Sequence, residues 1–280
     1  MKIKKILNNS VILSLDSNDK EIIVMGRGIA YAKKVGDDVD PEQITKKFIL
    51  SSMEYPQRIL DLFSDVPLEC IELTNSIIQH AKQKISIELH DSLYISILDH
   101  IRASIERYKE GITLNNKLLW EIKNFYKDEF EIGLYALQLI EETYNIKMQE
   151  DEAGFIALHI VSSETNDDIH QTYEVTNFIQ NITNIVKYYF NIEYDSQSLG
   201  YYRFITHLKF FATRLFSQSE GDNRPLESDL LDMIKEKYVR PYLCSLKIKK
   251  YIEEKYQHSL DNDEILYLCI HIAKITERKD

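Results

Sequence analysis

Cysteine is scarce in this chain: its 280 residues include only Cys70, Cys244 and Cys269. They are odd in number, lie far apart and form no CxxC pair, which argues against a disulfide framework or a zinc knuckle. We expect all three in the core. No stretch approaches the roughly 18 uninterrupted apolar residues of a membrane span, and the start, MKIKKILNN, lacks the apolar segment and cleavage site of a signal peptide. These absences predict a soluble, cytoplasmic protein.

Motifs of enzyme chemistry are also missing. The sequence contains no GxSxG nucleophile elbow, no P-loop and no GxGxxG dinucleotide motif. Its histidines do not occur at H-x₃-H or a similar ligand spacing, which argues against a metal site. We therefore expect no enzymatic activity, no cofactor and no bound metal.

The charge is distributed unevenly along a chain that is long enough for two or three cores. It is 44% hydrophobic with a net charge of −11. Residues 1–55 hold nine Lys/Arg against eight Asp/Glu, which leaves 25 against 37, or −12, on the remaining 225 residues. Any contact with a phosphate backbone therefore belongs to the N-terminal part.

Short β-strands are predicted for the first 35 residues. Alternating or branched apolar stretches are separated by turn residues. The predicted strands are Ile3–Leu7, Val11–Leu15, Glu21–Met25 and Ile29–Ala32. A sheet this small cannot cover both of its faces, so we expect it to dimerise sheet on sheet.

A short linker helix is predicted after these strands. Asp40, Pro41 and Gln43 supply an N-cap, an N1 proline and an N3 glutamine, which is the pattern of a helix start. We expect this helix to end near Leu50.

The rest of the chain contains an internal repeat. A run LLWEIKNFY beginning at Leu118 matches LLDMIKEKY beginning at Leu230, and IEETY and ALHI match IEEKY and CIHI at the same offset of 112 residues. The first histidines, His100 and His207, are offset by 107, so about five residues are inserted between the matching runs, in the loop at 221–225.

The apolar spacing changes to a helical period from Asp65 onward. Helical segments are predicted at 67–83, 91–109, 115–127, 130–145 and 151–163, with the last four repeated in the second copy and a further helix over 171–192. A polar linker is expected at 162–170. The prediction is an α+β multidomain protein, in which a small four-stranded antiparallel β domain (1–56) precedes two all-α helical bundles (65–169 and 170–280).

Each copy places a histidine beside its apolar stripe and an arginine on the same helix face. His100 is followed seven residues later by Arg107, and His207 by Arg214, so each pair lies two helical turns apart. A neutral imidazole is a nucleophile near pH 7, and a guanidinium can hold a phosphoryl group on it. The pattern is typical of a phosphorylated histidine, whereas a surface histidine packed on its own helix is the alternative.

His159 and His271 lie in more apolar surroundings. For these two residues, a hydrogen-bonded core histidine and a functional histidine both fit the pattern.

The most distinctive stretch of the chain is VMGRGIAYAKKVGDDVD at 24–40. Glycines flank Arg27 and allow the backbone to approach a ligand closely, while Tyr31 offers a ring for stacking. Lys5, Asn8 and Asn9 come from the neighbouring sheet edge, and asparagine amides suit base edges or the 2′-hydroxyls of an RNA minor groove. An ordinary hairpin loop is the alternative.

These motifs together resemble the BglG/LicT-type transcriptional antiterminators, over essentially the whole chain. The resemblance is carried by MKIKKILNNSVI, the 24–40 block, DHI at 99–101, ALHI at 157–160, RFITHLKFFATR at 203–214 and CIHI at 269–272. It implies a co-antiterminator RNA-binding domain followed by two regulation domains of the phosphotransferase system (PTS).

The resemblance also implies roles for individual residues. The implied RNA-binding residues are Lys5, Asn8, Asn9, Ser10, Gly26, Arg27, Gly28 and Tyr31. The implied phosphorylated histidines are His100, His159, His207 and His271, with Asp99, Arg107 and Arg214 in support. Ser10 stands where the family leads us to expect asparagine, and Thr206 stands where the first copy has Asp99.

Such a protein is expected to bind a leader-RNA hairpin as a homodimer and to prevent formation of an overlapping terminator. The resemblance implies that a sugar-specific PTS permease phosphorylates the first module and inactivates the protein, whereas the carrier protein HPr phosphorylates the second and activates it. Two other functions remain open: a phosphohistidine carrier, and a DNA-binding activator. Residues 1–55 contain no helix-turn-helix pattern, which argues against the activator.

Overall fold

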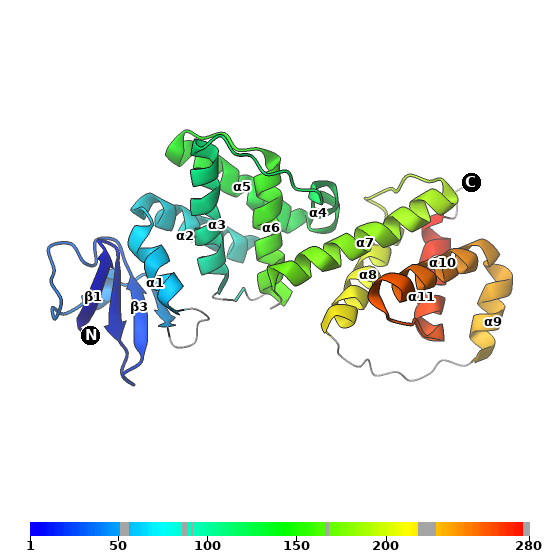
Figure 1. Cartoon of the computed structure of the whole chain (residues 1–280), viewed down its shortest axis with the longest axis horizontal. Coiled ribbons are helices and arrows are strands. Elements are labelled where there is room, and N and C mark those ends of the chain that lie inside the picture. The colour runs from blue at the N-terminus through cyan, green and yellow to red at the C-terminus, as the bar shows by residue number, and fades with distance from the viewer. Residues whose placement is uncertain (51–55, 86–88, 91, 166–167, 218–227, 277–280) are drawn as a thin grey trace. The chain divides into compact units, whose positions relative to one another are not determined.

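A computed structural model describes residues 1–50, 56–85, 89–90, 92–165, 168–217 and 228–276. Its contacts divide the chain into two units, Met1–Asn116 with Asp128–Asn166, and Lys117–Lys127 with Asp167–Asp280. A four-stranded antiparallel sheet at the N-terminus is followed by helices (Figure 1), which confirms the predicted α+β fold.

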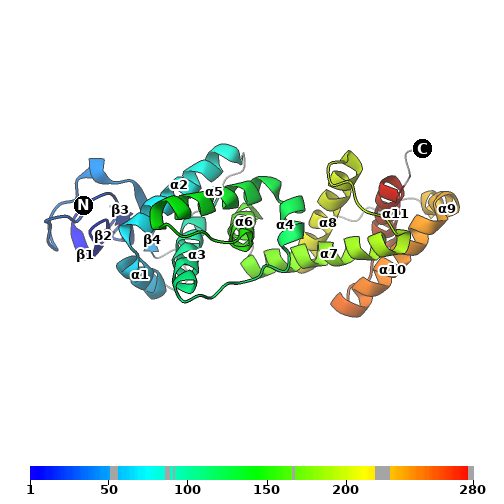
Figure 2. The ribbon, with the colours of Figure 1, turned by 90° about the horizontal axis from the view of Figure 1, so that it is seen from above.

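The sheet has the strand order β1-β2-β3-β4, with every neighbouring pair antiparallel. Its strands are β1 (Ile3–Asn8), β2 (Val11–Leu15), β3 (Glu21–Met25) and β4 (Lys46–Ile49). Figure 2 shows the four strands from above, next to helix α1 (Pro56–Asp65). The first three predicted strands are confirmed.

The fourth predicted strand, at 29–32, is wrong because this segment folds as consecutive turns. The amide of Ile29 donates to the carbonyl of Gly26 (3.1 Å), and the amide of Tyr31 to that of Gly28 (2.9 Å). Gly28 and Ala32 both have positive φ, which a strand does not allow. The place beside β3 is taken by β4 instead.

The predicted linker helix at 40–50 is also wrong beyond its first turn. Asp40 caps a 3₁₀ turn at Pro41–Gln43 by accepting from the amide of Glu42 at 3.0 Å. The chain then extends, because the amide of Thr45 donates to the carbonyl of Met25 at 2.8 Å and starts the pairing of β4 with β3. Sheet pairing therefore overrides the local helix signal.

Both faces of the sheet are covered within the chain. One face packs against α1 and against α3 (Ser92–Lys109), where the ring of Phe48 lies 6.2 Å from Phe63 and 5.2 Å from Tyr94. The other face packs under the loop that carries Ile29 and Val39. The expectation of one open apolar face is therefore wrong, because it left α1 and this loop out of account.

In its described residues, the first unit adds five α-helices to the sheet. They are α1, α2 (Leu68–Lys84), α3, α5 (Lys127–Tyr144, all but its first residue) and α6 (Glu150–Thr165). The periodicity predicted all of them except α1. The polar linker expected at 162–170 is shorter than predicted, since α6 continues to Thr165 and Asp168 already caps the next helix, α7.

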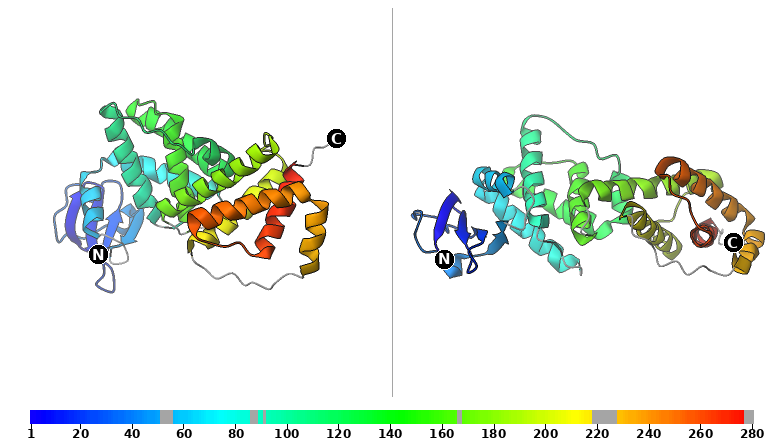
Figure 3. Two further views of the ribbon diagram at one scale, coloured as in Figure 1. Left: turned by 45° about the vertical axis from the view of Figure 1, so that its right-hand side comes forward. Right: turned by 60° about the horizontal axis from the view of Figure 1, so that its bottom comes forward.

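The second unit is entirely helical in the part that the structure describes. It contains α4 (Leu119–Phe125), α7 (Ile169–Phe190), α8 (Leu199–Ser217), α9 (Ser228–Lys237), α10 (Val239–Tyr256) and α11 (Asn262–Thr276). Helix α11 packs against α8 and α10, seen from two sides in Figure 3. The insertion predicted at 221–225 lies outside the described residues.

All three cysteines are free and buried, as predicted. Among the described residues, no helix combines the length and the apolar character needed to cross a membrane.

Candidate functional sites

Main-chain hydrogen bonds hold the glycine-flanked loop beside the turn between β1 and β2. The amide of Gly26 donates to the carbonyl of Ser10 at 2.9 Å, and the amide of Ala30 donates to that of Asn9 at 3.1 Å. The two sequence segments with candidate nucleic-acid contacts therefore meet at one end of the sheet.

This end of the sheet presents a cation and an aromatic ring to solvent. The side chain of Arg27 is 87% exposed, and Tyr31 is 75% exposed. Lys5 and Asn9 are exposed as well. Exposed guanidinium, amide and aromatic groups are those that bind phosphates, base edges and unstacked bases in RNA.

The loop requires glycine at two positions for different reasons. A Cβ on Gly26 would lie 1.9 Å from the carbonyl oxygen of Gln43, so the 3₁₀ turn leaves no room for a side chain. Gly28 has space but a φ of +65°, which L-residues rarely adopt. Together the two glycines fix the loop that presents Arg27.

Three candidate residues are engaged within the chain. Asn8 donates its side-chain amide to the carbonyl of Phe63 at 2.7 Å and accepts from the amide of Ser10 at 2.8 Å. Ser10 itself is buried, with 2% exposure. Arg27 lies 3.7 Å from Glu72 of α2, but both side chains are at least half exposed, so this pair contributes little.

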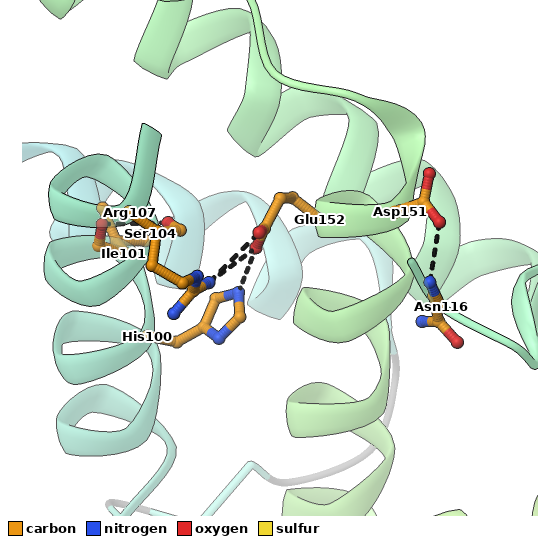
Figure 4. Close-up of polar contacts among 7 residues, drawn as sticks. All are labelled: His100, Ile101, Ser104, Arg107, Asn116, Asp151 and Glu152. Carbon is orange, nitrogen blue, oxygen red and sulfur yellow. Dashed lines mark hydrogen bonds and ion pairs between the residues drawn. The ribbon is translucent and has the colours of Figure 1, made fainter. Parts of the chain in front are cut away.

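In the first helical module, His100 and Arg107 of α3 converge on one carboxylate from α6. Nε2 of His100 lies 3.0 Å from Oε2 of Glu152, and Nη2 of Arg107 lies 3.1 Å from Oε1 of Glu152 (Figure 4). The side chains of His100 and Glu152 are each only 12% exposed. The predicted proximity of His100 and Arg107 is thus realised through a third residue.

The groups around Glu152 favour the charged form of its carboxyl over the neutral form. Burial by itself raises the pKa of this carboxyl, but the hydrogen bonds and charges of His100 and Arg107 outweigh that effect and lower it. The start of α6 is also fixed, since the amide of Asn116 donates to Oδ1 of Asp151 at 2.7 Å.

His159 lies beside His100, with ring centroids 5.1 Å apart. Burial, together with the charge of His100, lowers the pKa of His159 to about 3. Its imidazole is therefore neutral near pH 7. The structure brings together two histidines that the sequence placed 59 residues apart.

The second module repeats the pair of neighbouring histidines and the contact between an arginine and a carboxylate. His207 of α8 and His271 of α11 stack with centroids 5.1 Å apart, and the ring of Tyr267 lies 5.4 Å from His207. Burial, followed by the charges of His271 and Arg214, lowers the pKa of His207 to about 4, and burial also lowers the pKa of His271. Arg214 again contacts a carboxylate, that of Glu264, at 3.6 Å.

Two site predictions can be compared with these contacts. Asp99 lies on α3 and is half buried, but the carboxylate that reaches His100 is that of Glu152. The sequence did not reveal this role of Glu152, although its match with Glu264 in the repeat was a visible signal. Thr206, at the position of Asp99, donates to the carbonyl of Tyr202 within its own helix.

Each module therefore offers a pair of neighbouring imidazoles with a guanidinium two turns away. At neutral pH a neutral imidazole can accept a phosphoryl group, and the guanidinium can bind the added negative charge. Within the described residues, no group of three or more His, Cys, Asp or Glu side chains could hold a metal ion.

Comparison with known protein families identifies a family for the N-terminal β domain and for both helical modules. The family described as "CAT RNA binding domain" matches residues 1–56, and the family described as "PRD domain" matches twice, over residues 75–163 and 180–275.

Individual relatives agree with these matches. The chain is 46% identical to the transcription antiterminator LicT of Bacillus subtilis, covering 99% of this chain and 100% of that protein. It is 42% identical to the "Beta-glucoside operon antiterminator" of Dickeya chrysanthemi, covering 98% and 96%. The crystal structure of GlcT CAT-PRDI superimposes with a TM-score of 0.52 at 32% identity, covering 59% of this chain and 98% of that one.

Proposed function

Because this chain belongs to the family of transcription antiterminators that join a CAT RNA-binding domain to PRD domains, we propose that it binds a leader-RNA hairpin and prevents formation of a terminator. The proposed target lies upstream of a sugar-utilisation operon. The name of the Dickeya chrysanthemi relative supports β-glucosides as the sugar class. The proposed parts are the RNA-binding domain at 1–56 and the two regulatory domains at 65–169 and 170–280.

One observation carries the RNA-binding part of this proposal: Arg27 and Tyr31 stand open to solvent on a glycine-fixed loop beside Asn9. The slight positive charge of residues 1–55 supports the same surface, since the rest of the chain is strongly acidic.

The test is binding of the full chain to the leader hairpin at several salt concentrations. Arg27→Ala should weaken binding by about 1–3 kcal/mol and reduce the salt dependence by about one phosphate contact. Arg203→Ala, which removes an exposed arginine from α8, is the control and should bind like the unmodified chain. Equal affinity of the Arg27 variant and the control would exclude this surface.

We further propose that the paired histidines control the RNA-binding domain. In this proposal a sugar-specific PTS permease phosphorylates His100 and His159 and inactivates the protein, and HPr phosphorylates His207 and His271 and activates it. The neutral imidazoles and the neighbouring arginines of both modules support this assignment. Mass spectrometry that preserves phosphohistidine, after incubation with each donor, tests it.

The active form in this proposal is a homodimer joined sheet on sheet. The sheet face with Leu13, Ile23 and Phe48 is apolar and here packs against α1 and α3. In this proposal the second sheet packs on this same face, so dimer formation requires these helices to move away. A phosphate-dependent change in the packing of the first module would thereby reach the RNA-binding domain. Light scattering of the phosphorylated and unmodified chain tests this coupling.

A further inference from the structure

We propose that Glu152 is an internal competitor of the phosphoryl group in the first module. Its carboxylate occupies the position, between Nε2 of His100 and the guanidinium of Arg107, that a phosphoryl group on Nε2 must take. This inference rests on the proposed function, in which His100 accepts a phosphoryl group.

The carboxylate covers the nitrogen that has to react. Nε2 of His100 is buried and faces Oε2 of Glu152 at 3.0 Å. Arg107 is bound as well, since Nη2 lies 3.1 Å from Oε1 and 3.4 Å from Oε2 of the same carboxylate (Figure 4). A carboxylate and a phosphoryl group are both anions with oxygen acceptors, so they compete for the same guanidinium.

In the second module the equivalent carboxylate, that of Glu264, still lies 3.6 Å from Arg214, but it is also held by its own helix. Glu264 lies at the third position of α11, and its Oε2 accepts from the amide of Asp261 at 3.2 Å. In return, Oδ1 of Asp261 accepts from the amide of Glu264 at 2.8 Å. This reciprocal pair is a capping box, which keeps the glutamate at the start of its own helix.

The first module lacks the residue that completes this box. Gln149 stands at the position of Asp261, one residue before α6 begins at Glu150. The amide of Glu152 donates to the main-chain carbonyl of Gln149 at 3.1 Å, so it makes no bond to a capping carboxylate. The side chain of Glu152 is therefore available to cross to α3. A single difference between the repeats, Gln149 against Asp261, accounts for the two positions of the glutamate.

The structure also provides space for a displaced carboxylate. A cavity of about 100 Å³ adjoins Glu152 and is lined by Ser104, Tyr108, Lys147 and Gln149, among others. Rotation of Glu152 into this cavity would uncover Nε2 of His100 and release Arg107. The ammonium group of Lys147 and the hydroxyl groups of Ser104 and Tyr108, which line the cavity, would then face the displaced carboxylate.

Phosphoryl transfer then proceeds as an exchange between two imidazoles. The lone pair of Nε2 forms the new N–P bond as the N–P bond of a phosphohistidine donor breaks, and the donor nitrogen keeps the electron pair. While Nε2 faces Glu152 it carries the proton that it donates to the carboxylate. As Glu152 rotates away, this proton leaves to solvent and Nδ1 takes one up, so the lone pair of Nε2 becomes free to attack. Arg107 exchanges the carboxylate for the phosphoryl oxygens. Glu152 thus raises the barrier for the first module without affecting the second.

The experiment uses potassium phosphoramidate, a small phosphoryl donor that requires no partner protein, on the full chain. Site-resolved mass spectrometry follows label on His100 and His207 over time. Glu152→Gln keeps the shape of the side chain but removes its charge, and should accelerate labelling of His100 about tenfold, the size of one charge-assisted hydrogen bond. Glu264→Gln is the matched control and should change labelling of His207 much less.

A second variant keeps the carboxylate and changes only its position. Gln149→Asp completes the capping box in α6 and should draw Glu152 away from His100, so His100 is again labelled faster. This variant adds a negative charge near His100, which by itself would slow the reaction with an anionic donor. Faster labelling therefore reports the displacement of Glu152 and not the added charge. Circular dichroism measures whether each variant is folded. If Glu152→Gln does not fold, the labelling rate of Gln149→Asp tests the proposal by itself.

An unchanged or slower labelling of His100 in the folded variants would overturn the proposal and indicate that Glu152 orients the imidazole instead. Failure of the proposed function gives a different result. In that case His100 takes up no label in the unmodified chain or in either variant, whereas failure of this inference alone leaves His100 labelled at an unchanged or lower rate.

Discussion

The side-chain amide of Asn8 donates a hydrogen bond to the main-chain carbonyl of Phe63 at 2.7 Å and thereby ties the end of β1 to α1. Phe63 lies in the last turn of α1, where carbonyl groups have no partner within the helix. Asn8, predicted as an RNA contact, therefore caps a helix in this conformation.

Removing this cap should loosen α1. Asn8→Ala should destabilise the packing of α1 on the sheet by about 1 kcal/mol, because the carbonyl of Phe63 loses its donor. Hydrogen exchange measured by mass spectrometry should become faster in the peptide that covers 56–65. Asn9→Ala removes an exposed amide from the adjacent position and should leave this exchange unchanged; equal effects of both variants would contradict the capping role.

Tyr31 should contribute to RNA binding through its ring rather than its hydroxyl. Tyr31→Ala should weaken binding of the leader hairpin by roughly 1–3 kcal/mol, the usual contribution of one base stacked on an aromatic side chain. Tyr31→Phe should keep most of the affinity. Fluorescence anisotropy measures both, and Tyr188→Ala, which removes a ring of similar exposure from α7, provides the control.

Two helical glycines should respond in opposite ways to alanine. A Cβ on Gly133 of α5 would lie 2.3 Å from the carbonyl oxygen of Ala153 in α6, so Gly133→Ala should force the helices apart at a cost of about 1–3 kcal/mol. The nearest atom to a Cβ on Gly200 of α8 is an ordinary 3.6 Å away. Gly200→Ala should therefore be neutral or stabilise by up to about 1 kcal/mol through helix propensity. Thermal melting of both variants checks this difference in sign.

The sequence predicted most helices of the modules because their apolar period is long and appears twice. It failed where a short segment is decided by its neighbours. Lys46–Ile49 has too few residues to show a period, and it becomes a strand because β3 offers an open edge. Helix α1 lies before Asp65, where the predicted helical region begins, although its buried residues Ile59, Leu62 and Phe63 have helical spacing.

The candidate sites were predictable as residue types but not as contacts. The repeat singled out all four histidines and both arginines, and helical geometry placed His100 and Arg107 on one face. The contact of both residues with Glu152 depends on the distance between α3 and α6, which the sequence does not state. The capping pattern at Asp261 and Glu264 was visible in the sequence, and so was its absence at Gln149.

Acid should destabilise the first unit through His159. Its pKa is lowered to about 3 in the folded chain, mainly by burial, against about 6.5 when unfolded. Below pH 6.5 the unfolded chain therefore binds a proton that the folded chain does not. Stability is complete above this pH and falls on acidification by up to about 1.4 kcal/mol per pH unit.

The contribution of His159 can be separated from that of Glu152 by its pH window. The pKa of Glu152 is lowered below its ordinary value of 4.5, so its stabilising effect is lost only in more acidic solution. Urea titrations between about pH 7 and 5 should therefore report on histidines. His159→Gln should flatten the pH dependence in this range, whatever its effect on absolute stability. His170→Gln, at an exposed position, should keep the slope of the unmodified chain, and an unchanged slope in His159→Gln would show that this imidazole is not buried in its neutral form.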